Sequence, residues 1–193
     1  MGTMALPQPD LFAEDSLPGG LVYRPEAMTA GQEKELAAFI AGLPLKPFEF
    51  VGGFTGNRRV VSFGWRYDFN KARLEEANDI PPELELLREQ VVTKFQRDPA
   101  RFQQVLVTEY DKGAGIGWHK DRPQFSEIIG VSLLEPCNFR LRRKQGTKWQ
   151  RASFTAEPRS AYLLSGVVRS EWEHSIPPME KLRYSVTFRS LKT

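Results

Sequence analysis

Hydrophobic residues recur at helical spacing in two stretches of the N-terminal half of the chain. In TAGQEKELAAFIAGL (residues 29–43) apolar side chains return every third or fourth position, and Thr29 with Gln32 forms a capping box. In PPELELLREQVVTKFQ (residues 81–96) two prolines open a second apolar stripe, which ends before Asp98. The pattern predicts two amphipathic helices.

After Phe102 the helical spacing disappears, and short runs of β-branched and aromatic residues follow one another between turn residues. These runs cover residues 104–110, 127–134, 138–144, 149–156, 161–165 and 182–191. Between the two helices, GGFTGNRRVVSFGWRYDF (residues 52–69) predicts one or two hairpins. Helices followed by many short strands indicate an α+β, mainly β fold: a sandwich or barrel with helices covering one face.

Composition adds limits to this picture. A chain of 193 residues with 40% hydrophobic and 26% charged residues is typical of one globular domain, and no apolar run is long enough to span a membrane. One cysteine excludes an intramolecular disulfide, and no secretory signal is evident, so the cytoplasm is the simplest location. We expect a monomer with a loose arm at residues 1–20 and one domain at 21–193.

The net charge of +3 is modest, but the basic residues are clustered. The predicted hairpin from Phe139 to Arg151 alternates apolar and basic positions, so that one face would be basic and exposed, as phosphate contacts require. A solvated surface with no partner is the alternative interpretation. The clustered residues that we assign to a nucleic-acid backbone are Arg58, Arg140, Arg142, Arg143 and Lys144.

Three residues could form a metal site. The chain has two histidines, His119 in GAGIGWHKDRPQF and His174 in RSEWEHSIPP. In extended backbone His119 and Asp121 point to the same side, and two histidines with one carboxylate form the facial triad of non-haem Fe(II) oxygenases. A hydrogen-bonded surface pair or a zinc site remains open on this evidence alone.

The last predicted strand, KLRYSVTFRSL, alternates polar and apolar residues. Its polar face carries Arg183, Ser185, Thr187 and Arg189, and faces either solvent or a pocket. Beside a metal, the fork of Arg183 could bind the far carboxylate of an anionic co-substrate through two parallel hydrogen bonds.

These motifs together resemble those of the AlkB family of Fe(II)- and 2-oxoglutarate-dependent dioxygenases. The matching residues are His119-x-Asp121, then His174, then Arg-x-Ser-x-Thr-x-Arg, where the family has Arg-x-Asn-x-Thr-x-Arg. The similarity extends from about residue 21 to 191. The motifs agree with those of the family in their residues, their order and their spacing.

The resemblance implies a double-stranded β-helix (a jelly roll) with a core at about residues 102–191, helices on one face, and a nucleotide-recognition lid at about residues 50–70. It implies Fe(II), 2-oxoglutarate and O2 as cofactor and co-substrates. His119, Asp121 and His174 would bind and activate iron. The residues that would contact 2-oxoglutarate are Arg183, Tyr110, Thr108, Arg189 and Ser185.

Family members oxidise an N-alkyl carbon on a nucleobase and release an aldehyde, so the resemblance implies alkylated DNA as the partner, with RNA as a further candidate. The aromatic and basic residues that would contact the extruded base are Phe63, Trp65, Tyr67, Arg59, Arg66, Trp118, Arg122 and Arg189. Packing of these aromatics in the core is the competing interpretation.

Three departures from the family pattern leave the preferred base open. Ser185 and Thr108 stand where the family has asparagine, and Arg122-Pro123 follows the metal motif where some members carry an acidic residue. Two other hypotheses therefore stay open. One is an oxygenase acting on RNA modifications or a protein side chain, and the other is a non-catalytic nucleic-acid-binding module or zinc site.

Overall fold

The structure is a computed structural model that describes residues 17–49, 55–68 and 70–192. Most of the expected arm at residues 1–20 and the start of the expected lid at residues 50–70 lie outside the described residues. The described elements are β1 (Leu21–Arg24), α1 (Ala30–Ala41), β2 (Lys46–Glu49), β3 (Thr55–Phe63), β4 (Trp65–Asp68), β5 (Arg73–Glu76), α2 (Pro82–Thr93), a 3-10 turn η1 (Pro99–Arg101), β6 (Gln104–Tyr110), β7 (Ile116–His119), β8 (Phe125–Leu133), β9 (Cys137–Gln145), β10 (Lys148–Ala156), β11 (Ala161–Leu164), α3 (Gly166–Glu171), β12 (Glu173–Ile176) and β13 (Arg183–Leu191).

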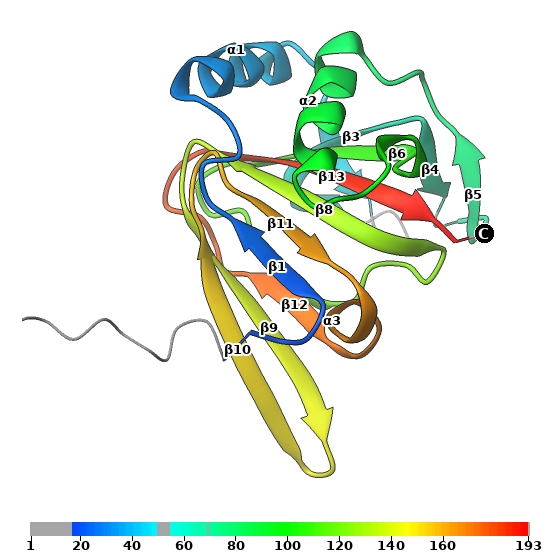
Figure 1. Cartoon of the computed structure of the whole chain (residues 1–193), viewed down its shortest axis with the longest axis vertical. Helices are drawn as coiled ribbons and strands as arrows, with labels where there is room; N and C mark the ends of the chain where they lie inside the picture. Colours follow the sequence, from blue (N-terminus) through cyan, green and yellow to red (C-terminus); the bar gives the residue numbers. More distant parts are fainter. Residues whose placement is uncertain (1–16, 50–54, 69, 193) are drawn as a thin grey trace, which may run out of the picture.

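Two antiparallel sheets form the body of the molecule (Figure 1). We call the seven-stranded sheet, in the order β1-β11-β8-β13-β6-β3-β2, the major sheet, and the four-stranded sheet, in the order β10-β9-β12-β7, the minor sheet. From β6 to β13 the chain passes repeatedly from one sheet to the other. This winding is the double-stranded β-helix that the sequence resemblance predicts.

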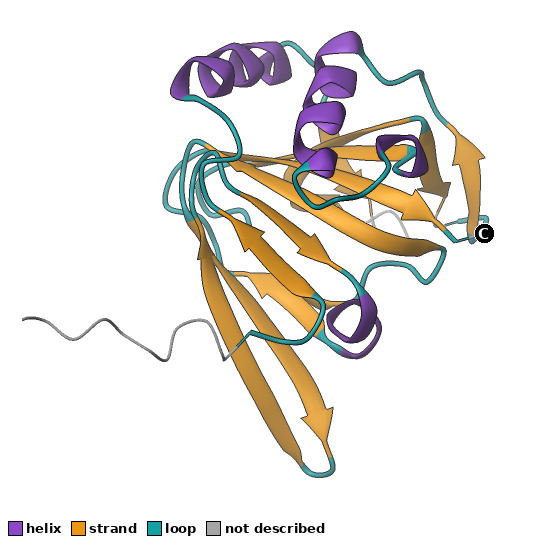
Figure 2. Cartoon of the chain, viewed as in Figure 1, coloured by secondary structure: helices purple, strands orange, loops and turns teal. Residues whose placement is uncertain are grey.

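Helices α1 and α2 cover one face of the major sheet (Figure 2). Thr29 caps α1 through the predicted capping box with Gln32, which satisfies backbone donors at the helix start. The apolar stripes of α1 and α2 pack on one set of strand positions, and Ile40, Leu84 and Val186 are 0% exposed there. Burial of these stripes supplies the hydrophobic stabilisation that holds the helices on the sheet.

A second core lies between the two sheets and surrounds the candidate site. Its members come from the opposite strand faces, with Tyr110 and Ile128 from the major sheet and Phe139, Leu141 and Ile176 from the minor sheet. Along β6 and β13, successive residues therefore point alternately toward the helices and toward this inner space. The polar residues of β13 face inward.

The region of the expected lid differs from its prediction. The sequence predicts that Phe63, Trp65 and Tyr67 belong to one lid, but Gly64 separates β3 from β4 with a φ of 71°, and a side chain there would collide with the Gln103 carbonyl oxygen. β3 is an integral strand of the major sheet, paired with β6, whereas β4 pairs with β5 in a separate hairpin. In the described part of the chain, no helix is long and apolar enough to cross a membrane.

Candidate metal and co-substrate site

His119, Asp121 and His174 come together at one end of the minor sheet. β7 and β12 pair antiparallel with His119 directly opposite His174, so both imidazoles lie on the same face. Asp121 follows His119 by two residues, in the segment between β7 and β8. One potential ligand atom from each of the three residues lies within 4.8 Å of the other two. Sheet register thus brings together two motifs that lie far apart in the sequence.

Hydrogen bonds and packing orient the two imidazoles. His119 Nδ1 lies 2.9 Å from the Gly117 carbonyl oxygen, and a proton donated there leaves Nε2 with a free lone pair. The His174 ring stacks on Phe139, with centroids 5.2 Å apart and 17° between the planes. His174 Nε2 lies 3.4 Å from Asp121 Oδ2. One nitrogen of each ring and one carboxylate oxygen thus converge.

The charge states of the three residues suit a divalent metal. Burial lowers the pKa of His174 to about 3, against a smaller opposing effect of Asp121. Burial also lowers the pKa of His119. For Asp121 burial alone would raise the pKa, but Arg189 and the two histidines outweigh it, and the pKa lies below its usual range. At neutral pH the set is two neutral imidazoles and one carboxylate, which fits Fe(II).

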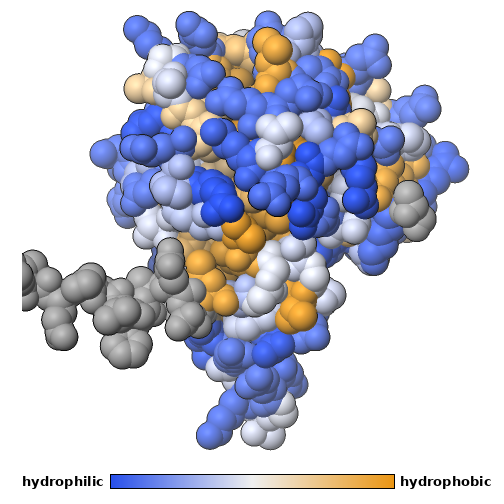
Figure 3. All heavy atoms as spheres, viewed as in Figure 1, coloured by the Kyte–Doolittle hydropathy of each residue, from blue (hydrophilic) through white to orange (hydrophobic). Residues whose placement is uncertain are grey.

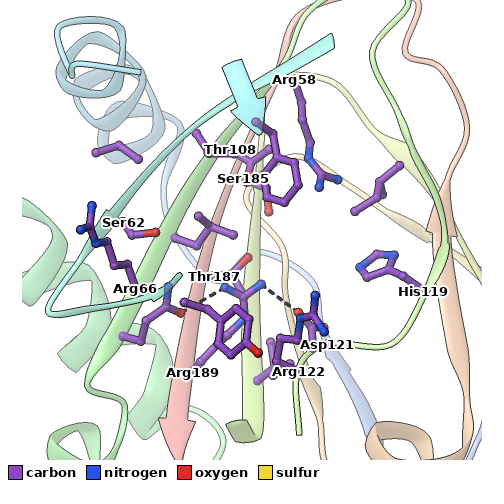
Figure 4. Close-up of a pocket in the computed structure, with 18 of the residues that line it drawn as sticks. Arg58, Ser62, Arg66, Thr108, His119, Asp121, Arg122, Ser185, Thr187 and Arg189 are labelled. Carbon is purple, nitrogen blue, oxygen red and sulfur yellow. Dashed lines mark hydrogen bonds and ion pairs between the residues drawn. The ribbon is translucent and has the colours of Figure 1, made fainter. Parts of the chain in front are cut away.

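Arg189 holds the carboxylate in place. Its Nη2 donates to Asp121 Oδ1 at 2.9 Å and its Nη1 donates to Gln104 Oε1 at 3.1 Å, as the dashed lines in Figure 4 show. Arg189 therefore fixes one carboxylate oxygen while the other faces His174. From α3, Arg169 donates to the Phe125 carbonyl oxygen at 2.8 Å and ties down the end of the loop that carries Asp121.

The inward face of β13 continues the site away from the metal ligands. Ser185 lies opposite Thr108, and Arg183 lies opposite Tyr110, in the β13–β6 register. Thr108, Tyr110 and Ser185 line the same cleft as the triad. Of the two alternatives that the sequence leaves for this polar face, solvent and a pocket, the placement favours the pocket.

Arg183 lies behind the cleft lining and is 0% exposed. Its Nε donates to Ser132 Oγ at 3.1 Å, and its guanidinium carbon lies 5.2 Å from the centre of the Tyr110 ring. Among the described residues neither Nη1 nor Nη2 has a hydrogen-bond partner. Two buried donor atoms without a partner destabilise the protein unless an acceptor binds them, and the two oxygens of one carboxylate can accept from both. The residues present therefore fit 2-oxoglutarate.

The expected base contacts are only partly brought to the cleft. Phe63 is 5% exposed and packs in the core under the helices, so it does not face a substrate. Trp65 is not among the residues that line the cleft, whereas Arg66, Tyr67 and Arg122 are. The Arg122 guanidinium lies 4.9 Å from the centre of the Tyr67 ring, and the two residues form one wall.

Arg58 lies in the cleft, whereas Arg59 does not. Arg58, expected at a nucleic-acid backbone, is 9% exposed, lies 4.2 Å from the Phe48 ring centre and points toward the space beside His119 (Figure 4). Burial lowers its pKa. Arg59, expected at the substrate, is on the other side of β3, where Nε and Nη2 donate to the Glu109 carboxylate at 2.6 and 2.8 Å.

The basic hairpin is partly neutralised by acidic partners. Arg142 pairs with Glu173 at 2.6 Å, and Arg143 pairs with Glu171 at 2.7 Å. Lys144 is exposed. Arg140 Nε donates to Ser175 Oγ at 3.1 Å. The structure thus commits Arg143 to a structural contact and leaves the hairpin less cationic than its composition indicates.

Sequence reasoning missed several residues that support the site. Ser132 and Gln104 hold the two arginines of β13, and Phe139 supports the His174 ring. Gln104 stands opposite Arg189 in the strand register, but that register is known only once the strands are paired. The sequence pattern contained no signal for Ser132.

The chain matches the 2OG-Fe(II) oxygenase superfamily over residues 53–189. It is 29% identical over 199 residues to the Alkylated DNA repair protein ALKBH8 homolog of Arabidopsis thaliana, in an alignment that covers 89% of this chain and 55% of that protein. It is 28% identical over 127 residues to Uncharacterized protein L905 of Acanthamoeba polyphaga mimivirus, covering 59% of this chain and 60% of that protein. The chain therefore spans little more than half the length of these curated relatives.

Solved structures show the same fold. The structure of OsALKBH1 superposes with a TM-score of 0.67 at 16% identity, over 90% of this chain and 98% of that one. A 2OG-Fe(II) oxygenase family oxidoreductase from Burkholderia pseudomallei gives a TM-score of 0.62 at 17% identity, over 89% of this chain and 85% of that one. Together with the matched residues and the His-Asp-His site, these findings show that the chain belongs to the 2OG-Fe(II) oxygenase superfamily.

Proposed function

We propose that the protein oxidatively removes alkyl groups from N-alkylated nucleobases, in DNA and also in RNA, with release of succinate, CO2 and an aldehyde. The observation that carries this proposal is the continuous cleft that joins the His-Asp-His triad to the co-substrate residues and to a basic, aromatic wall. The name of the Arabidopsis relative, a DNA repair protein, is in keeping with this substrate class.

Each part of the cleft has a distinct task. His119, Asp121 and His174 hold Fe(II), which, when bound with 2-oxoglutarate and O2, supplies the oxidation of a C–H bond. Arg183 and Tyr110 bind and orient the co-substrate. Tyr110 and its neighbours on the inner sheet faces form largely apolar walls that exclude water from the reacting carbon.

The overall reaction balances without a protein nucleophile. One oxygen atom of O2 enters succinate as 2-oxoglutarate loses CO2, and the other converts N–CH3 to N–CH2OH. The C–N bond then breaks, the hydroxyl proton is lost as the aldehyde forms, and the base nitrogen gains a proton. The protein positions the alkyl carbon beside the triad.

The wall of the cleft gives the base-recognition residues. An extruded base needs an aromatic surface and donors for its edge. Tyr67 supplies the aromatic surface, with the planar guanidinium of Arg122 against its ring, and the guanidinium of Arg58 supplies donors beside the triad. Arg66, whose Nη2 donates to Glu75 Oε2 at 3.1 Å, has an exposed side chain at the rim of the cleft, and we assign it to a phosphate of the bound strand.

A panel assay tests the proposal. Methyl- and etheno-modified bases in DNA and RNA oligonucleotides are incubated with the protein, Fe(II), 2-oxoglutarate and O2, and aldehyde is measured. The proposal predicts aldehyde release that requires all three additions. Turnover of 2-oxoglutarate with a protein substrate but with no modified oligonucleotide would refute the substrate class and leave the oxygenase assignment intact.

Arg58 and Arg59 make a matched pair for this assay. Arg58→Met removes a guanidinium from the cleft, and should lower turnover of modified oligonucleotides. Arg59→Met removes a neighbouring guanidinium that binds Glu109 outside the cleft, and should leave that turnover at the parent level. Equal effects of the two substitutions would contradict the assignment of Arg58.

A further inference from the structure

The outer face of the minor sheet, which points away from the triad, carries an unusual set of side chains. On β7 and β12, the residues next to His119 and His174 point outward, away from the triad. On β9, the residues next to the inward-facing Phe139 and Leu141 also point outward. The residues that share this outer face are Trp118, Arg140, Arg142, Lys144, Trp149, Arg151, Ser153, Glu173 and Ser175.

Two tryptophans and an arginine form a stack across this face. The Arg142 guanidinium carbon lies 4.5 Å from the centre of the Trp118 ring and 4.2 Å from that of the Trp149 ring. Beside the stack, Arg140 lies 5.3 Å from the centre of the Trp118 ring and donates to Ser175 Oγ, and Ser175 is 0% exposed. The stack therefore runs from β7 to β10, across all four strands of the sheet.

The outer end of the stack is open. Trp149 is 38% exposed, although an indole ring is usually buried for its large apolar area. The outer face as a whole carries four basic residues and one acidic residue, Glu173, so it has an excess of positive charge. Hydrophilic side chains also cover the projecting hairpin in Figure 3. An exposed aromatic ring among cations suits an anionic, aromatic partner.

The inner end of the stack adjoins the metal site. Trp118 precedes His119 directly and is among the residues that line the cleft. Four strands at a spacing of about 4.8 Å give a platform about 14 Å across, which is enough for two or three unpaired nucleotides. A strand lying along it would reach the cleft with its next base.

We propose that the outer face of the minor sheet binds unpaired nucleic acid and leads it to the cleft, so that the protein favours single-stranded substrates. This inference rests on the proposed function. Bases in a duplex are already stacked on each other, so their faces are not offered to Trp149. In a single strand each base can stack on an indole while the phosphates meet the surrounding arginines.

The test is equilibrium binding of fluorescent oligonucleotides, single-stranded and duplex, to the full chain by anisotropy. Trp149→Ala should weaken single-strand binding by about 5- to 150-fold, the range for loss of one stacked base, and duplex binding by less than about twofold. Trp149→Phe should retain most of the affinity. Arg151→Glu should weaken binding and reduce its dependence on salt.

Two substitutions elsewhere serve as controls. Leu86→Ala removes another exposed apolar side chain, and Lys34→Glu makes the same change of charge on α1. Both should leave the dissociation constants unchanged. Parent-like binding by Trp149→Ala, equal losses for single strand and duplex, or binding of an acidic peptide in place of oligonucleotides would each overturn the platform.

Binding also separates this inference from the proposed function. A parent protein that binds single strands through Trp149 but releases no aldehyde from any modified oligonucleotide would refute the dealkylation and support the platform. A protein that dealkylates short oligonucleotides with undiminished affinity after Trp149→Ala would refute the platform and support the dealkylation.

Discussion

Replacement of Arg183 by methionine should have opposite effects on co-substrate binding and on folding stability. The Arg183 side chain is completely buried, its Nε donates to Ser132, and among the described residues its two Nη atoms have no partner. Methionine is similar in length but apolar. The substitution therefore removes a buried charge together with the two donors that we assign to the 2-oxoglutarate carboxylate.

The expected magnitudes follow from those contacts. Two hydrogen bonds to a charged group contribute about 3–6 kcal/mol, so the dissociation constant of 2-oxoglutarate should rise by about 10²- to 10⁴-fold. Without 2-oxoglutarate, loss of the Ser132 bond costs about 1 kcal/mol. Removal of an unpaired buried charge offsets that loss or exceeds it, so the free energy of unfolding should stay the same or increase.

Anaerobic titration of the Fe(II)-loaded protein measures the first effect, and urea unfolding without 2-oxoglutarate measures the second. Arg88→Met is the control, because Arg88 is also largely buried but donates to the Phe102 carbonyl oxygen and pairs with Glu85. It should destabilise the fold and leave 2-oxoglutarate binding unchanged. If Arg183→Met instead behaves like Arg88→Met, the reasoning about the unpaired fork is wrong.

Three further predictions concern two of the metal ligands and Arg189, which holds Asp121. Asp121→Ala should abolish Fe(II)-dependent turnover with an unchanged circular dichroism spectrum, and retained turnover would show that another group binds the metal. Arg189→Gln should weaken Fe(II) binding by about 10- to 100-fold because Asp121 loses its partner, and an unchanged affinity would refute that positioning role. Burial holds the pKa of His174 near 3, below its ordinary 6.5, so between these values the unfolded state binds a proton that the native state does not. In urea unfolding, the free energy of unfolding of the metal-free protein should fall by about 2 kcal/mol between pH 8 and pH 5. An equal fall in His174→Phe, which lacks this imidazole, would contradict the assignment of the effect to His174.

Much of the fold follows from periodicity in the sequence. The strict alternation of β13 predicted that Tyr184 and Val186 face the core, and both are buried there. Alternation left open whether the polar face meets solvent or a pocket, and the metal motif with the family resemblance favoured the pocket. Thr29 and Gln32 marked the start of α1 because capping is a local interaction. The metal ligands were found through spacing together with the family resemblance.

Other features depend on contacts between distant segments and were not predicted. Neighbouring Arg58 and Arg59 look equivalent in the sequence, and the pairing of β3 with β6 decides which of them faces the cleft. Likewise, Arg142 and Arg143 read as free basic residues until β12 and α3 bring Glu173 and Glu171 against them. Such charge pairing has no local signature.

Anaerobic optical titration with Fe(II) and 2-oxoglutarate tests the assigned site most directly. The parent protein should develop a charge-transfer band only when both are present, Asp121→Ala should develop none, and Arg183→Met should require far more 2-oxoglutarate. Tight binding of zinc by the parent protein, with no band at any concentration of Fe(II) and 2-oxoglutarate, would contradict the assignment.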